Sequence, residues 1–280
     1  MRDGNRETAD AVIHAAELEE RCEYVPAVSS FLTISEQAEL WRRVRYPHRL
    51  FFWGGFSGAE RRCAVFIPEW AADGAPYGGA VRFDSSEREG YLAGLLFGED
   101  APFTEIAENV SLVSIYGSGH KELSHRDILG SLMGLGITRQ SVGDICMVSS
   151  SAATVALSGK LFEYVSAELS KVGSDGVKVS LVSRPDKFIF ERRFEELSVT
   201  VASMRLDGVV SAVTGMSRTR AAEQISAGLV QLSGIVCDSV ASEVSEGDTI
   251  SVRGYGKFLV SGTDGITRKS RIRVIIKKYI

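Results

Sequence analysis

The sequence predicts a multi-domain α+β protein, and three observations lead to this fold class. The chain has 280 residues, which is more than one hydrophobic core usually serves, since single domains run about 100–150 residues. Its middle section alternates strand-like and helix-like patterns in a regular order. Its charge changes sign along the chain, because residues 1–197 hold 21 Lys/Arg and 29 Asp/Glu, whereas residues 198–280 hold 11 and 7.

Residues 1–104 are expected to form an N-terminal domain of helices and one β-hairpin. The opening stretch, MRDGNRETADAVIHAAELEERC, has the spacing of an amphipathic helix. Thr33, followed three residues later by Glu36, is a capping box, which predicts that a second helix begins here. The stretch from Ala71 to Gly90 is rich in glycine and polar residues and is predicted to be a loop.

The hairpin is predicted from HRLFFWGGFSGAERRCAVFIPEW, in which two apolar runs flank a glycine-rich turn. Aromatic residues crowd the turn, and two roles are open to them. They could form a platform on which nucleic-acid bases stack, but such residues more often pack a core, and we expect the core. The aromatic residues concerned are Phe51, Phe52, Trp53 and Phe56.

Residues 105–184 are expected to form a central domain of the ferredoxin-like type. The predicted elements, in order, are a strand over 109–117, a helix over 123–136, strands over 143–148 and 152–157, a helix over 160–173 that stops at Gly173, and a strand over 177–182. This βαββαβ order is the ferredoxin-like plan, which RRM domains share. The third strand, AATVAL, lacks the basic and aromatic residues by which RRM domains bind RNA, so we expect no RRM-like contact.

A domain boundary is predicted at Pro185 and the charged run DKFIFERRFEEL that follows it. Beyond it, Leu206, Val209, Val210 and Val213 have helical spacing. A second, shorter helix is expected in SRTRAAEQISAGLV, ending at Gly228, with short strands and tight turns after it.

The closing stretch KSRIRVIIKKYI alternates like a strand with one cationic edge. The last thirty residues hold eight basic groups and a single acid, Asp264. This asymmetry indicates either a polyanionic partner or a strand edge that lysines and arginines keep from aggregating, and charge alone leaves both open. One side of the strand carries Lys269, Arg271, Arg273 and Lys277, and the other carries Ser270, Ile272, Val274 and Ile276.

Several functional classes find no support in the sequence. No apolar run approaches the ~18 residues of a membrane span, and the N-terminus resembles neither a signal peptide nor a transit peptide, so the cytoplasm is the expected compartment. The cysteines are 41, 83 and 91 residues apart, which is too far for a zinc site or a redox dithiol. We expect no metal, no cofactor and no small-molecule substrate.

Two short strings resemble catalytic motifs. His125-Arg126-Asp127 is like a kinase catalytic loop, but Leu132 stands where the metal-binding Asn would be, so a helix start is predicted instead. Pseudouridine synthases carry their catalytic aspartate in a string like Arg205-Leu206-Asp207. Because the 73 residues after Asp207 leave no room for a catalytic domain, we expect Asp207 in the first turn of a helix and no enzymatic activity.

The last section resembles the S-four RNA-binding domain, an αL module. The resemblance covers about 60 residues and rests on R-L-D, S-R-x-x-A, I-x-x-G-x-V and G-D-x-I in SMRLDGVVSAVTGMSRTRAAEQISAGLVQLSG and EGDTISVRGYGKF. Ser233 departs from the pattern, since the family commonly has Asn there. FFWGGFSGAERR and LSHRDILGSLMGLGITRQSVGDI in turn resemble the YlmH family of bacterial S-four proteins, so the likeness spans nearly the whole chain.

Four sections are therefore expected: the N-terminal domain (1–104), the central domain (105–184), an S-four-type RNA-binding domain (198–262) and a basic C-terminal strand (263–280). The resemblance implies a non-enzymatic, ribosome-associated protein that binds rRNA and tRNA on the large subunit, where stalled complexes carrying peptidyl-tRNA are rescued, and in some bacteria a link to cell division. An RNA-modifying enzyme with this domain as its handle, and a cell-division scaffold, are the alternatives.

The expected RNA contacts are phosphate contacts, which give affinity and register rather than sequence reading. Arg218 and Arg220 lie about 200° apart around a helix, so they cannot form one stripe, and which of them meets phosphate stays open. The predicted RNA-binding residues are Arg205, Ser217, Arg218, Thr219, Arg220, Lys257, Lys269, Arg271 and Arg273.

Overall fold

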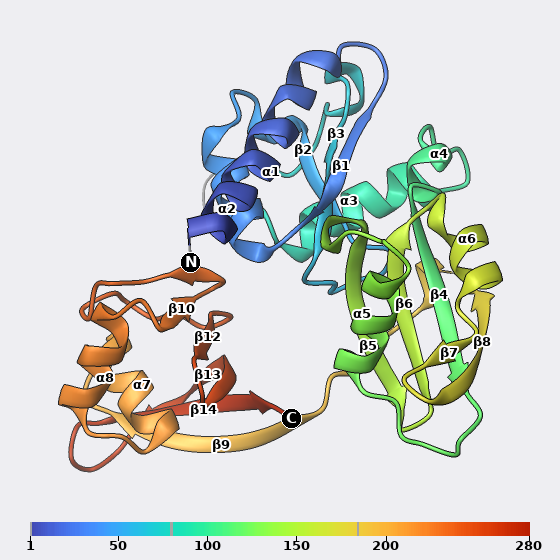
Figure 1. The fold of residues 1–280 in the computed structure, drawn as a ribbon. Helices are drawn as coiled ribbons and strands as arrows, with labels where there is room; N and C mark the ends of the chain where they lie inside the picture. Colours follow the sequence, from blue (N-terminus) through green and yellow to red (C-terminus); the bar gives the residue numbers. More distant parts are fainter. Residues whose placement is uncertain (1, 79–80, 184) are drawn as a thin grey trace. The chain divides into compact units, whose positions relative to one another are not determined.

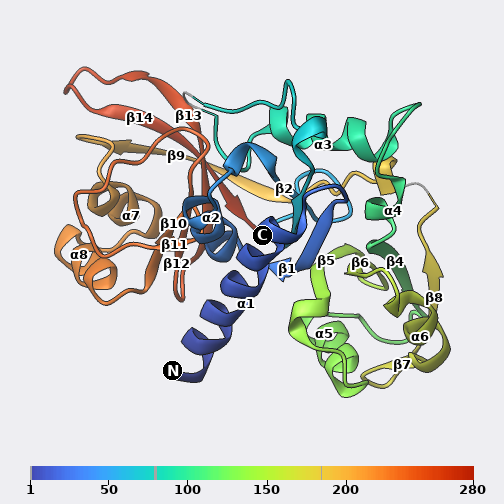
Figure 2. The same ribbon diagram turned by 90° about the horizontal axis from the view of Figure 1, so that it is seen from above.

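The computed structural model describes residues 2–78, 81–183 and 185–280 (Figure 1). The chain forms two compact units, residues 1–190 and 191–280. Helices and strands occur in both, so the multi-domain α+β class is confirmed. Figure 2 shows the same chain from above.

The N-terminal part of the first unit is a three-stranded antiparallel sheet of order β1-β3-β2 between two layers of helices. The capping box is confirmed, because the Thr33 hydroxyl accepts from the Glu36 amide while the Glu36 carboxylate accepts from the Thr33 amide. The elements are α1 (Arg2–Arg21), β1 (Ala27–Leu32), α2 (Ile34–Arg43), β2 (Leu50–Trp53), β3 (Arg62–Phe66), α3 (Ser86–Phe97) and α4 (Thr104–Ala107), with 3₁₀ turns at Pro47–Arg49 and Glu69–Ala71.

The aromatic residues of the hairpin belong to the core, as predicted, since Phe51, Phe52, Trp53 and Phe56 are 1–4% exposed. Because side chains alternate along a strand, the sheet packs α1 and α2 against one face and α3 against the other. Two expectations are corrected. Strand β1 lies where only helices were foreseen, and α3 begins at Ser86, inside the stretch predicted to be loop.

The central part of the first unit is a five-stranded sheet of order β5-β6-β4-β8-β7 in which all neighbours are antiparallel. Two helices cover one face and share a core with it. The elements are β4 (Val110–Gly117), α5 (His125–Gly134), a 3₁₀ turn at Arg139–Ser141, β5 (Val142–Ser149), β6 (Ala152–Ser158), α6 (Leu161–Glu168), β7 (Lys171–Val172), β8 (Asp175–Leu181) and a 3₁₀ turn at Pro185–Lys187.

Helix α6 is shorter than predicted, because it ends at Glu168 and residues up to Gly173 form a turn and a short strand. Leu169 and Val172 are still buried there, 5% and 2% exposed, which is why their spacing imitated a longer helix. Gly173 takes φ +61° in the β7–β8 hairpin turn rather than at a helix end. The helix start at His125-Arg126-Asp127 is confirmed, with Ser124 as its cap.

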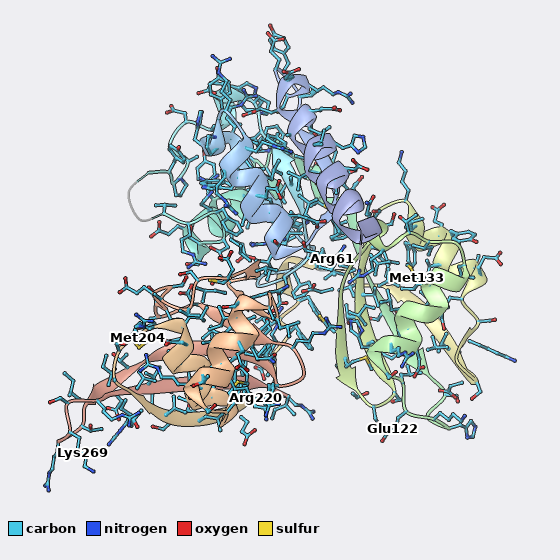
Figure 3. All side chains as sticks on the ribbon, turned by 60° about the vertical axis from the view of Figure 1, so that its left-hand side comes forward. Arg61, Glu122, Met133, Met204, Arg220 and Lys269 are labelled. Carbon is cyan, nitrogen blue, oxygen red and sulfur yellow. The ribbon has the colours of Figure 1, made fainter. Side chains whose placement is uncertain are left out.

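The two parts of the first unit are joined through Asp144 and Arg61, the latter labelled in Figure 3. The Asp144 carboxylate accepts from the amides of Glu60 and Arg61 at 2.7 and 3.0 Å, and the Arg61 guanidinium donates to the Val142 carbonyl. A Cβ at Gly143 would lie 2.6 Å from the Phe31 ring, so this strand position needs glycine. These contacts join the two sheets within one compact unit.

The second unit is a six-stranded antiparallel sheet of order β11-β10-β12-β13-β14-β9 with two helices on one face. Strand β9, which the sequence suggested was a boundary segment, is the edge of this sheet and pairs with β14 along eight residues. The elements are β9 (Phe194–Val201), α7 (Leu206–Thr214), α8 (Arg218–Ser226), β10 (Val230–Leu232), β11 (Ile235–Val236), β12 (Thr249–Val252), β13 (Gly256–Ile266) and β14 (Ile272–Tyr279).

The two faces of this sheet differ. Val274 and Ile276 of β14 and Phe258 of β13 are buried in one core with α7 and α8. The residues between them therefore face away from the helices. We call the two sides the helix face and the open face.

Candidate nucleic-acid interface

The centre of the helix face is one carboxylate between two arginines. Arg205 Nε lies 3.2 Å from Asp207 Oδ1, and Arg218 Nη2 lies 3.1 Å from Asp207 Oδ2. The Asp207 side chain is 11% exposed, whereas those of Arg205 and Arg218 are 44% and 55% exposed. A nearly buried acid thus orients two guanidiniums that still reach solvent.

The fold explains why Asp207 stands there. It lies in the first turn of α7, as predicted, where the helix dipole favours an anion, and Oδ1 accepts from the Gly208 amide at 2.8 Å. Burial alone would raise the pKa of Asp207, but the hydrogen bonds and charges of Arg205 and Arg218 outweigh it and lower the pKa below its ordinary value. A carboxylate held ionised in this way is a weak proton acceptor and a good anchor for cations.

Helix α8 presents its N-terminus beside this cluster. Ser217 is its N-cap, and the Ser217 hydroxyl accepts from the Arg220 amide at 3.3 Å. The side chains of Arg218, Thr219 and Arg220 are exposed. Among the residues that the structure describes, no carboxylate pairs with Arg220. The two arginines therefore differ, because Arg218 is tied to Asp207 and Arg220 is not.

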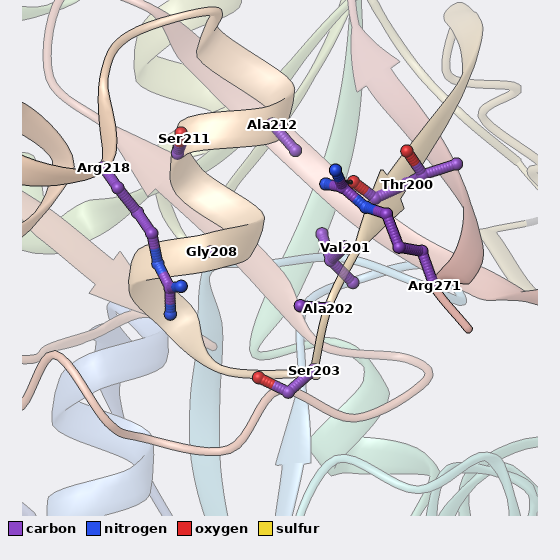
Figure 4. Close-up of a pocket in the computed structure, with 9 residues that line it drawn as sticks. All are labelled: Thr200, Val201, Ala202, Ser203, Gly208, Ser211, Ala212, Arg218 and Arg271. Atoms are coloured by element: carbon purple, nitrogen blue, oxygen red, sulfur yellow. Dashed lines mark hydrogen bonds between the residues drawn. The ribbon is translucent and has the colours of Figure 1, made fainter. Parts of the chain in front are cut away.

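A pocket of about 190 Å³ opens beside α7. Figure 4 shows Arg218 on one side of it and Arg271 on the other. Arg271 is held there because its Nη2 donates to the Thr200 carbonyl at 2.7 Å. Small residues form the floor, so a ligand can approach the α7 backbone closely. The residues that complete the lining are Thr200, Val201, Ala202, Ser203, Gly208, Ser211 and Ala212.

The structure brings together only some of the predicted RNA-binding residues. Arg205, Ser217, Arg218, Thr219, Arg220 and Arg271 surround α7 and the start of α8. Lys257 and Arg273 do not extend that surface, since they precede Phe258 and Val274 of the core and so lie on the open face. Arg273 also pairs with Asp264, at 3.1 Å. Lys269 stands in the turn between β13 and β14, apart from Arg220 in Figure 3.

Sequence reasoning missed the floor of the pocket. Gly208, Ser211 and Ala212 lie on the side of α7 away from the buried Leu206, Val209 and Val210. Their small size at helical spacing was a usable signal. The part played by Thr200 and Ser203 was not visible, because strand β9 was not foreseen.

The departure at Ser233 has a structural explanation. Ser233 takes φ +49°, a left-handed conformation in which Asn is common and Ser is not. Its hydroxyl donates to Asp248 Oδ1 at 2.7 Å, and its amide donates to the Thr249 carbonyl. These bonds hold the turn between β10 and β11 without the asparagine.

The described residues offer neither a metal site nor a membrane span. No group of three or more His, Cys, Asp and Glu side chains there is arranged to hold a metal ion. Nor does any helix in the described ranges combine the length and apolar character needed to cross a membrane.

Comparison with known proteins finds two domain families on this chain. Residues 108–186 match the family described as "Putative RNA-binding domain in YlmH", and residues 204–250 match the S4 domain, the S-four domain above. A Bacillus subtilis (strain 168) protein named ribosome-associated protein quality control protein P2 is 29% identical over 229 residues, which is 82% of this chain and 77% of that protein.

One solved structure adds little. Cell division protein ylmH from Streptococcus pneumoniae covers 66% of this chain and 95% of its own, at 16% identity and a TM-score of 0.44, which is too low to support an argument about the fold. The two domain matches and the Bacillus relative agree with one another. Together they support the YlmH family of S4-domain proteins as the one that this chain resembles.

Proposed function

We propose that this protein binds structured RNA through the helix face of its second unit and catalyses no reaction. The observation that carries the proposal is the excess of guanidiniums around α7 and α8. Arg205 and Arg218 flank one nearly buried carboxylate, Asp207, while Arg271 lines the pocket with Arg218 and Arg220 is exposed in the first turn of α8. Guanidiniums, free helix-terminal amides and a small pocket fit phosphate groups, and such contacts hold an RNA by its shape.

Arg218 and Arg220 should contribute to RNA binding in different ways, because their contacts differ. Arg218 lines the pocket and is oriented by Asp207, so it fixes the position of a phosphate. Arg220 has its full charge available to the backbone of the RNA. Both contribute, one through geometry and the other mainly through charge.

We also propose that the RNA is ribosomal. The name of the Bacillus relative, a ribosome-associated quality control protein, supports this. The finer assignment is that the protein acts in the cytoplasm on large subunits carrying peptidyl-tRNA, with rRNA and tRNA as its contacts. This assignment rests on the family resemblance and not on any residue of the site.

For the central part of the first unit we propose the ferredoxin-like fold. The strand order β5-β6-β4-β8 supports it, because β6 separates β4 from β5, as in a split βαβ unit. We keep 105–184 and 198–262 as the limits of the central and S-four-type domains, with 1–104 before them and the strand within 263–280 after them.

Co-sedimentation with ribosomes tests the RNA-binding site. Arg218→Glu together with Arg220→Glu should abolish sedimentation with ribosomes, while circular dichroism keeps its native form. The matched control is Arg42→Glu with Arg43→Glu, two exposed arginines in the last turn of α2, which should leave sedimentation unchanged. Nuclease treatment should release the wild-type protein. If the helix-face variant still sediments with ribosomes, the assignment of this site is wrong. If nuclease treatment also fails to release the wild-type protein, a protein partner holds it on the ribosome.

A further inference from the structure

The open face of the second unit carries an aromatic pair surrounded by cations. The rings of Phe194 and Tyr279 lie edge to face, with centroids 4.9 Å apart. Lys257 Nζ lies 4.9 Å from the centre of the Tyr279 ring, and Lys277 Nζ lies 5.8 Å from that of Phe194. The Arg192 guanidinium carbon lies 5.8 Å from the Tyr279 ring. We call these five residues the ring patch.

The register of the sheet places the ring patch away from the helices. Tyr279 is directly opposite Phe194 in the β14–β9 pair, and Lys277 is opposite Glu196. Val274 and Ile276, which alternate with Lys277 along β14, are fully buried against the helices. Three neighbouring strands, β13, β14 and β9, therefore present the patch on one continuous surface.

The two rings are not part of the packed core of this unit. Neither Phe194 nor Tyr279 belongs to the hydrophobic cluster under α7 and α8, and both are half-buried rather than buried. The patch carries three cations, and Glu196 lies opposite one of them, Lys277, in the β14–β9 pair. Half-buried aromatic rings flanked by lysine and arginine side chains are the combination that surfaces binding single-stranded nucleic acid use.

We propose that the ring patch binds unpaired nucleotides of RNA. A base has a π-face that stacks on an aromatic ring, and the phosphates on either side of it meet lysine and arginine side chains. The patch supplies both, on the surface of a hydrogen-bonded sheet. The pocket on the helix face, by contrast, is lined by the guanidiniums of Arg218 and Arg271 and by small residues.

The consequence is that one unit contacts RNA on two sides with two chemistries. Folded RNA meets the helix face, and a neighbouring single strand lies across the open face. The ring patch does not depend on the helix-face proposal, and the two are tested with different residues and different probes.

The first test compares two RNA probes on the full-length protein. Phe194→Leu with Tyr279→Leu keeps apolar side chains but removes the ring faces. This double variant should weaken binding of a fluorescent oligouridine of about 12 nucleotides by roughly tenfold or more, since stacking is worth that much per base. Binding of a duplex hairpin RNA should change less than about twofold. Tyr24→Leu, an exposed aromatic of the first unit outside both matched regions, is the control and should change neither.

A second test uses neighbouring lysines that face opposite sides. Lys277 lies over the Phe194 ring, whereas Lys278 pairs with Glu195 at 3.6 Å. Lys277→Gln should weaken oligouridine binding several-fold and flatten its salt dependence, and Lys278→Gln should do so less. Because neither substitution removes an aromatic ring, both variants should fold as the wild type does.

Ultraviolet cross-linking of 5-iodouridine RNA should attach the probe to the peptides that carry Tyr279 or Phe194. Oligouridine binding that is unchanged in both the ring and the lysine variants would overturn the proposal, and would mean that another protein surface covers the patch. Equal loss of duplex and single-strand binding would overturn it too. Loss of duplex binding in the helix-face variant alone, with oligouridine binding kept, would support it.

Discussion

The central region and the second unit, each of which contains a match to an RNA-binding family, differ in charge. Residues 108–186 hold seven Lys/Arg and eight Asp/Glu, whereas the second unit, 191–280, holds 13 and 10. In the central region, moreover, Arg139 serves the fold. Arg139 donates to the Val142 carbonyl, and burial, with the charge of Arg61 beside it, lowers the pKa of Arg139 to about 10.

This difference in charge means that the two regions should contact RNA by different means. Phosphate affinity needs cations that keep their charge in solvent, and those are concentrated in the second unit. The central region also exposes cations, Arg126 among them, but its acidic groups outnumber its basic ones. We therefore expect salt-dependent affinity to come from the second unit.

The largest expected effect comes from reversing one charge in each region. Arg220 and Arg126 are both exposed arginines in the first turn of a helix, α8 and α5. Arg220→Glu should weaken RNA binding by about 10- to 100-fold, given about 1.5–3 kcal/mol for a charge-assisted contact. Arg126→Glu should weaken it by less than about twofold. Filter binding to rRNA fragments measures both, and equal losses would erase the contrast between the regions.

The two arginines of α8 should separate stability from binding. Arg218→Gln leaves the nearly buried Asp207 with Arg205 alone, which should cost about 0.5–1 kcal/mol at this half-exposed pair. The second unit should then melt about 2–8 °C lower, whereas Arg220→Gln should leave its melting temperature unchanged. Both should weaken RNA binding. Calorimetry that shows the same melting temperature for both variants would mean that the Arg218–Asp207 pair does not hold the fold.

Only some elements of the fold could be predicted from the sequence. Local signals sufficed for the capping box at Thr33, the cap at Ser124 and the position of Asp207 in a helical turn, because each depends on neighbours in sequence. Strand β9 was missed because Glu195 and Glu196 stand side by side, so the run lacks the alternation of a strand with one wet face. Its partner β14, 71 to 85 positions away, decides its structure.

The candidate site, too, could be predicted only in part from the sequence. The sequence located cations, but not which side of the sheet the helices would cover, and that placement separates Lys257 from Arg218. The bond from Arg218 to Asp207 spans 11 residues and two helices, so spacing alone could not reveal it. Tertiary packing, rather than any local sequence preference, determines that Arg218 and not Arg220 pairs with Asp207.

A smaller effect should appear when the pH falls. The pKa of Asp207 is lower in the folded chain than its ordinary value of 3.8, so the unfolded chain binds this proton more readily. The resulting stability is fully present well above 3.8, and it is lost as the pH falls through that value and below. Denaturant midpoints of the second unit should therefore fall more steeply between about pH 5 and pH 3 in the wild type than in Asp207→Asn. Parallel curves would show that the two arginines do not lower this pKa.

The smallest effect is expected at Ser233, and it should be confined to the second unit. Ser233→Ala keeps the left-handed backbone but removes the donor to Asp248, so it should destabilise by about 1 kcal/mol. Ser233→Asn restores the residue that suits φ +49° and offers an amide donor in place of the hydroxyl, so it should change stability by less than about 0.5 kcal/mol, towards greater stability. Urea denaturation followed separately for each unit distinguishes the two. A larger loss with Asn than with Ala would show that the hydroxyl, and not the backbone conformation, governs this turn, and the absence of family-typical asparagine would then be a local adaptation to Asp248.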